Sequence, residues 1–138
     1  MKVRAKSLAL SDGQIEAAGA NLMLRPKYSL SLGKCYVVLG IYFPSFSKIF
    51  GRSAVFRLVD DDGSCIPCPA QLFDIVSDKP SQYWRARISE TDFFLFPEEF
   101  YEQYFFDDLL EGVPSVEAKF IKIRGLLEEE ADELLPKK

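Results

Sequence analysis

The sequence predicts an α+β fold that is mainly β: a small antiparallel β-barrel or a strongly bent sheet, followed by one or two C-terminal helices. Three observations lead to this fold class. Short runs of β-branched and aromatic residues alternate with turn signals through the middle of the chain. The composition includes 12 Phe, 6 Tyr and one Trp, whose large rings suit a β-rich core in a chain of 138 residues. An acidic segment that begins at a proline comes after the last of these runs.

Several runs in the middle of the chain are expected to be strands. Asp62 and Gly63 supply the chemistry of a tight hairpin turn, and residues 69–73 are expected to form one helical turn. In the last run, alternation places Trp84, Ala86 and Ile88 on one face. The expected strands are residues 35–43, 54–59, 64–68, 73–76 and 83–88.

The first thirty residues give a less regular pattern. Residues 2–10 fit a strand and residues 14–24 fit a short helix, although Gly13 and Gly19 weaken both predictions. Arg25 and Pro26 mark a break, because proline has no amide hydrogen and restricts the residue before it.

The last third of the chain is expected to be largely helical. Pro97 is expected to open a helix that ends at Gly112. Residues 116–123 alternate and are expected to close the sheet as a strand, and residues 126–135 to form an acidic helix. We expect a single domain over 1–138, with a barrel-like core at about 30–88, an acidic aromatic helical segment at 97–111, and an acidic C-terminal tail or helix at 126–138.

Part of this pattern resembles a small SH3-like β-barrel. The resemblance is carried by the turn Gly33-Lys34-Cys35-Tyr36, the strand end at Asp62 and Gly63, and the turn at residues 69–73. It covers residues 30–76. The aromatic groove with which SH3 signalling domains bind proline-rich peptides is not evident, so the resemblance implies the fold and not the ligand.

The composition argues against several functions. There is no histidine, which removes the usual general base, the commonest metal ligand and every Ser–His or Cys–His nucleophile. We therefore expect no enzyme activity and no cofactor. Three cysteines, an odd number, favour free thiols in a reducing compartment, and hence a cytoplasmic protein. No apolar run reaches the roughly 18 to 20 residues that cross a bilayer, and the N-terminus lacks the apolar core of a signal peptide.

Two local motifs have both a chemical and a structural interpretation. Cys65 and Cys68 fit a redox pair, half of a zinc site, or two buried strand residues, and their place between a hairpin turn and a proline favours the last. Residues 60–64 fit a calcium loop or a hairpin turn, and their strand-like flanks favour the turn. No glycine-rich phosphate-binding loop is present, and no carboxylate pair is singled out for glycoside or peptide cleavage.

The charges are distributed unevenly. Residues 1–59 hold nine basic and two acidic residues, whereas residues 60–138 hold eight basic and nineteen acidic ones. Such asymmetry indicates an electrostatic partner or two halves that neutralise each other. The net charge of −4 and the sequence pI of about 4.9 argue against nucleic acid as the partner.

Residues 88–118 form the most unusual segment, with nine carboxylates and no lysine or arginine. Aromatic residues lie between the acids at helical spacing, as in Phe100 and Tyr104. The segment fits either an interface for a basic partner or a core helix with a solvated acidic face. The residues predicted to bind a partner are Glu98, Glu99, Tyr101, Glu102, Phe105, Asp107, Asp108 and Glu111.

The chain also resembles small bacterial immunity proteins, which are encoded beside polymorphic or contact-dependent toxins. The shared features are the strand entry at residues 33–36, the turn at residues 61–63, the strand at residues 73–76, a Pro-Ser-x-Tyr-Trp segment at residues 80–84 and the helix start at residues 97–100. This resemblance implies a stoichiometric inhibitor that masks a basic toxin domain in the cytoplasm. The alternative is a self-associating or phage-derived interaction protein, such as a homodimer, without a toxin partner.

Overall fold

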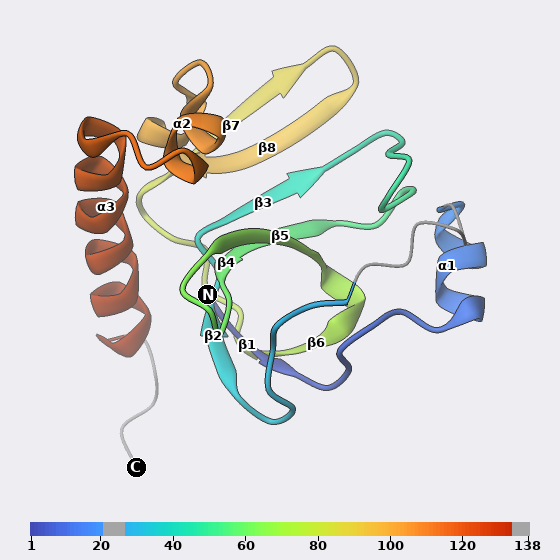
Figure 1. Cartoon of the computed structure of the whole chain (residues 1–138). Helices are drawn as coiled ribbons and strands as arrows, with labels where there is room; N and C mark the ends of the chain where they lie inside the picture. Colours follow the sequence, from blue (N-terminus) through green and yellow to red (C-terminus); the bar gives the residue numbers. More distant parts are fainter. Residues whose placement is uncertain (21–26, 134–138) are drawn as a thin grey trace.

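The computed structural model describes residues 1–20 and 27–133 (Figure 1). The fold is α+β and mainly β, as the sequence predicts: eight strands in the described residues form two antiparallel sheets. The first sheet has the order β2-β1-β6, with β1 at Lys2–Ala5, β2 at Cys35–Val37 and β6 at Phe73–Ser77. The second has the order β5-β4-β3-β8-β7, with β3 at Gly40–Phe43, β4 at Val55–Val59, β5 at Cys65–Pro69, β7 at Trp84–Ser89 and β8 at Asp92–Pro97.

Neither sheet in the described residues closes on itself. Of the two predicted alternatives, the closed β-barrel is therefore wrong, and the sheets are open, as in the other alternative. The boundaries of the expected barrel core, 30–88, also fail. Strand β1 lies at the centre of the first sheet and β8 lies inside the second, although both fall outside that range.

Two hydrophobic clusters pack against opposite faces of the five-stranded sheet. The first lies between the two sheets and includes Val3, Tyr36, Leu58 and Trp84. The second lies between the five-stranded sheet and the C-terminal helices and includes Leu39, Phe96, Phe100, Phe120 and Leu127. The molecule therefore has three layers, with the five-stranded sheet in the middle and helix α3 (Pro114–Glu133) on the outside (Figure 1).

The chain passes from one sheet to the other within residues 35–43, which were expected to be one strand. Val38 belongs to the first cluster and Leu39 to the second, so these consecutive side chains enter opposite cores. The Leu39 carbonyl accepts a 2.9 Å hydrogen bond from Trp84 Nε1. The next residue is Gly40, where a side chain would not fit, because a Cβ would lie 2.4 Å from Cδ1 of Phe96.

The hairpin and turn predictions in the middle of the chain are confirmed. Strands β4 and β5 pair across a turn in which Gly63 has a φ of 83°. A 3-10 turn, η1 (Ala70–Leu72), leads into β6 as expected. Trp84, Ala86 and Ile88 lie on one face of β7, but only Trp84 is buried, because the face extends beyond the first sheet.

The N-terminal predictions are confirmed in type and corrected in length. Strand β1 is shorter than the expected strand at residues 2–10. Helix α1 (Asp12–Ala18) begins at a capping box formed by Ser11 and Gln14, so it starts before the expected residue. Gly19 ends it with a φ of 73°. Residues 21–24 of the expected helix and the break at Arg25 and Pro26 lie outside the described residues.

The C-terminal predictions need two corrections. The expected helix over residues 97–111 is a 3-10 turn, η2 (Glu98–Tyr101), and a short helix, α2 (Phe105–Leu110). They are separated because Tyr104 has a φ of 61°, which a helix does not permit. Residues 116–123 are helical and not a strand. Val116, Phe120, Ile123 and Leu127 are buried at spacings of three and four, the period of a helix.

The predicted helix at residues 126–135 is confirmed as the second half of α3. Residues 134–138 of the predicted acidic tail lie outside the described residues.

Candidate functional site

The structure separates the eight predicted contact residues into one core residue and two surface groups. Phe105 is buried in the second cluster, with its ring 5.2 Å from that of Phe100, so its assignment to a contact surface is wrong. The η2 group consists of Glu98, Glu99, Tyr101 and Glu102, and the α2 group consists of Asp107, Asp108 and Glu111.

Much of the η2 group is already used within the molecule. Glu98 pairs with Arg87 of β7, and Glu102 accepts two hydrogen bonds from Lys119 of α3, at 2.8 and 3.0 Å. The Arg87 guanidinium also lies over the Tyr101 ring, 4.2 Å from its centroid. This group therefore joins β7 and α3 to η2, and two of its charges are neutralised.

The Tyr101 hydroxyl is bound to the backbone of two strands. It donates to the Arg85 carbonyl of β7 and accepts a 3.1 Å hydrogen bond from the Phe96 amide of β8. Burial raises the pKa of Tyr101, and the Phe96 amide and Arg87 oppose that rise. Tyr101 is therefore a structural residue of the β7–β8 hairpin, which the sequence did not indicate.

The α2 group differs from the η2 group in its ion pairs. None of Asp107, Asp108 and Glu111 forms an ion pair with a side chain of the described part of the chain. Asp107 and Glu111 are exposed, and Asp108 is half-buried.

Large apolar side chains lie exposed beside these acids. Tyr104 is 64% exposed and Leu110 is 86% exposed at the two ends of α2, and Ile121 of α3 is 69% exposed. Single exposed apolar residues are ordinary, but Leu110 and Ile121 line one depression with Asp107 and Glu117, which form no ion pair within the described residues. Apolar side chains grouped in this way beside carboxylates are typical of a contact surface. We call this surface the α2 face, and it consists of Tyr104, Asp107, Asp108, Leu110, Glu111, Glu117 and Ile121.

Four residues of the α2 face were not among the predicted contact residues: Tyr104, Leu110, Glu117 and Ile121. Leu110 follows Leu109 in an apolar pair that fits a core, but α2 ends there and buries only part of Leu109. Ile121 was assigned to a strand. The buried residues Phe120 and Ile123 are three apart and share one face of the helix, and this period would have placed Ile121 on the outside.

A depression of about 560 Å³ runs along the α2 face, between the edge strand β5 and helices α2 and α3. Leu110, Ile121, Asp107 and Glu117 lie on its helical side. Its lining on the side of the sheet includes Arg57 and Cys65, together with Phe106 from α2. The depression therefore combines apolar side chains, carboxylates and two half-buried arginines, Arg57 and Arg124, of which Arg124 pairs with Glu128.

Arg57 fixes α2 against the sheet. Its guanidinium carbon lies 3.8 Å from the centroid of the Phe106 ring. Burial lowers the pKa of Arg57, and Cys65 and Asp107 oppose this effect. Arg57 forms no ion pair with the described residues, so the nearby carboxylates remain available at the surface.

Cys65 and Cys68 are strand residues, which was the structural alternative to a redox pair or half of a zinc site. Both lie on β5, and residues three apart on a strand project to opposite faces. Cys68 belongs to the first cluster, whereas Cys65 packs against the second. Burial raises the pKa of Cys65 to about 11 and that of Cys68 to about 12. The two thiols therefore cannot bind one ion or form one redox pair.

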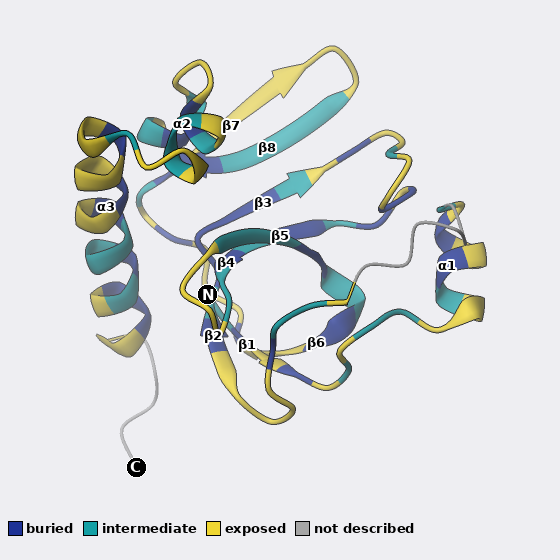
Figure 2. Cartoon of the chain, in the orientation of Figure 1, coloured by how far each residue is buried: buried dark blue, intermediate teal, exposed yellow. Residues whose placement is uncertain are grey.

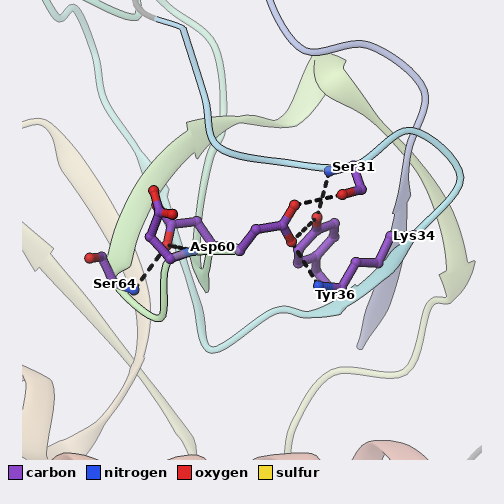
Figure 3. Close-up of polar contacts among 7 residues, drawn as sticks. Ser31, Lys34, Tyr36, Asp60 and Ser64 are labelled. Carbon is purple, nitrogen blue, oxygen red and sulfur yellow. Dashed lines mark hydrogen bonds and ion pairs between the residues drawn. The ribbon is translucent and has the colours of Figure 1, made fainter.

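Residues 60–64 form the predicted hairpin turn. Asp60 Oδ1 accepts the amides of Asp62 and Ser64, at 3.0 and 2.9 Å. Asp61 accepts hydrogen bonds from Ser31, Lys34 and Tyr36, which tie this turn to the one before β2 (Figure 3). Its oxygens are thus occupied by donors, and within residues 1–20 and 27–133 no group of three His, Cys, Asp or Glu side chains is placed to hold a metal ion.

The basic half of the chain is partly neutralised by the acidic half. Lys2 pairs with Asp132, Lys6 with Asp74 and Lys34 with Asp61. In the described residues, none of the ion pairs made by the acids of residues 88–118 reaches the basic half. Neutralisation of one half by the other, one of the two explanations predicted for the charge asymmetry, therefore holds for these lysines. It does not hold for the α2 face.

None of the helices in the described residues combines the length and apolar content needed to cross a lipid bilayer. No protein-family model, no curated protein and no solved structure matches this chain.

Proposed function

We propose that this chain is a non-catalytic protein-binding module, an immunity-type inhibitor that masks a cationic toxin domain in the cytoplasm through the α2 face. The observation that supports this function is the combination of exposed Tyr104, Leu110 and Ile121 with carboxylates that form no ion pair within residues 1–20 and 27–133. Large apolar groups supply the area that is buried on association, and unpaired acids attract and orient a basic partner.

The α2 group supports this role better than the η2 group. Glu98 and Glu102 would have to exchange Arg87 and Lys119 for groups of the partner, which reduces the gain from each new ion pair. Within the described residues Asp107 and Glu111 form no ion pair that a partner would have to break, although Asp107 lies close enough to Arg57 to interact with its charge. The proposed contact surface is accordingly centred on α2 and the adjoining part of α3.

The distribution of the lysines favours a different protein over a second copy as the partner. Self-association through charge needs a basic surface to meet the α2 face. Lys2, Lys6 and Lys34, three of the nine basic residues in the first 59, are used in ion pairs within the molecule. The homodimer alternative thus has less positive charge available than the sequence suggests.

The test is the affinity of the purified protein for the basic toxin domain encoded beside it, measured by calorimetry. Asp107→Lys, Asp108→Lys and Glu111→Lys, introduced together, should abolish binding and leave the circular dichroism spectrum unchanged. The matched control, Glu16→Lys, Asp78→Lys and Glu133→Lys together, reverses three exposed carboxylates on α1, in the loop after β6 and at the end of α3, and should bind as the wild type does.

Salt provides a second readout of the same proposal. Binding should weaken steadily between low salt and about 0.5 M, where charges more than a few ångströms apart are screened. Equal affinity of the triple variant and the wild type, or an affinity insensitive to salt, would show that the α2 face is not the site.

A further inference from the structure

Strand β7 forms an edge of the five-stranded sheet, and its free side is uncovered. Among the described residues the strand pairs only with β8, and each of its residues after Trp84 is exposed (Figure 2). The opposite edge differs, because β5 contains Pro67 and Pro69, which have no amide hydrogen to offer to another strand. Strand β7 contains no proline, so its edge is open to pairing.

The pairing register identifies the backbone groups that β7 offers. Ser89 pairs with Asp92 across a two-residue turn, and antiparallel pairs alternate between bonded and non-bonded. Ser89, Arg87 and Arg85 therefore bond to β8, while the amides and carbonyls of Ala86 and Ile88 point away from it. Those outward groups are the donors and acceptors that an added strand requires.

The two faces of β7 have different chemistry. On one face, Ile88 stands opposite Phe93, which stands opposite Phe43, so three strands contribute to one apolar row. The rings of Phe43 and Phe93 are 5.7 Å apart, and Ile88 is 73% exposed. This row continues the first core beyond the area that the first sheet covers.

The other face of β7 is basic. It presents Arg85 and Arg87, of which Arg87 is held by Glu98 and by the Tyr101 ring. Arg85 donates only to the carbonyls of Gln82 and Trp84, so its charge has no carboxylate partner in the described residues. A strand placed beside β7 would meet a hydrophobic row on one side and positive charge on the other.

The same arginines argue against a second copy of this chain as the added strand. A two-fold pairing of β7 with itself, centred on Ala86, sets Arg85 of each copy opposite Arg87 of the other. A pairing centred on Arg85 or on Arg87 sets that arginine opposite itself. Like charges directly opposite are destabilising, so each of these registers is disfavoured. A pairing centred on Ile88 sets Arg87 opposite Ser89 and avoids this repulsion, but it engages only residues 87–89 of the strand.

From this geometry we propose that β7 binds an extended segment of another protein, in which carboxylates alternate with apolar residues. The segment adds to the sheet as a strand, with its backbone paired to Ala86 and Ile88, its acids beside Arg85 and Arg87, and its apolar residues beside Ile88. This site is separate from the α2 face and does not depend on the function proposed for that face.

The experiment uses the full chain and two synthetic peptides. In one, glutamate alternates with valine, and in the other, lysine replaces each glutamate. Amide hydrogen exchange is followed by nuclear magnetic resonance. The acidic peptide should slow exchange at Ala86 and Ile88 by about tenfold when its concentration is tenfold above its Kd, and the lysine peptide should not. Equal slowing by both peptides, or none by either, overturns the proposal.

Variants connect the effect to the edge itself. Ala86→Pro removes the outward amide hydrogen without removing a bond to β8 and should abolish binding of the acidic peptide, whereas Ala86→Thr keeps the amide and should bind. Arg85→Glu should reverse the preference between the two peptides, and this result does not depend on whether the proline variant folds. Unchanged preference in Arg85→Glu would show that charge does not select the strand.

Discussion

Tyr104 and Phe105 are consecutive residues with opposite environments, since Tyr104 is 64% exposed and Phe105 is 2% exposed. The positive φ of Tyr104 turns the chain so that α2 begins with Phe105 in the core. Two neighbouring rings, of which only Phe105 was predicted from the sequence as a contact residue, thus have separate roles, Phe105 in stability and Tyr104 in the proposed binding.

Substitution of each ring should separate these roles. Phe105→Ala should lower the free energy of unfolding by about 3–5 kcal/mol, the cost of removing a large buried side chain. Tyr104→Ala should change it by no more than about 0.5 kcal/mol, as exposed positions do, and should weaken binding of the partner. Urea unfolding and calorimetry measure the two effects. A large loss of stability in Tyr104→Ala would contradict the assignment.

The contact between Arg57 and Phe106 gives a second prediction. In a double-mutant cycle with Arg57→Met and Phe106→Leu, the coupling free energy should be about 1 kcal/mol, because the cation lies against the ring in a half-buried site. The conservative changes keep most of the apolar volume in place. Additive effects of the two substitutions on urea unfolding would mean that the contact does not hold α2 to the sheet.

The turn at Asp61 gives a prediction about pH. Hydrogen bonds from Lys34, Ser31 and Tyr36 lower the pKa of Asp61 to about 2. A carboxyl whose pKa is lowered by folding adds stability above its unfolded pKa of about 4, and this stability is lost as the pH falls toward the folded value. Wild type should therefore exceed Asp61→Asn in stability at neutral pH.

Urea unfolding at a series of pH values tests this. The difference between wild type and Asp61→Asn should shrink below about pH 4 and vanish near pH 2. Glu16→Gln, which changes an exposed carboxylate of α1, is the control and should show no such trend. A difference that is the same at every pH would mean that the Asp61 hydrogen bonds do not depend on its charge.

Local signals predicted much of the sheet and little of the helical layer. The Asp62–Gly63 turn and the run at residues 54–59 depend on neighbouring residues, and both were placed correctly. The division of residues 35–43 between two sheets depends on Val38 and Leu39 entering different cores, which is a tertiary relationship. The local sequence carries no signal for it.

The candidate site shows the same division between local and tertiary information. The acidic residues of α2 were identified from composition, because charge does not need a fold to be counted. The burial of Phe105 and the neutralisation of Glu98 and Glu102 depend on β7 and α3, which pack against η2 from distant parts of the chain. The helical period of residues 116–127 was available in the sequence, but a short alternation within it was given more weight.

The most direct test of the proposed function is a hydroxyl-radical footprint of the protein alone and in complex with the basic toxin domain. Tyr104, Leu110 and Ile121 are exposed and should be oxidised in the free protein. In the complex their oxidation should fall, while Leu32 and Ile75, which are exposed in the loop before β2 and on β6, should react as before. Unchanged oxidation of the three α2-face residues in a complex that forms would contradict the account.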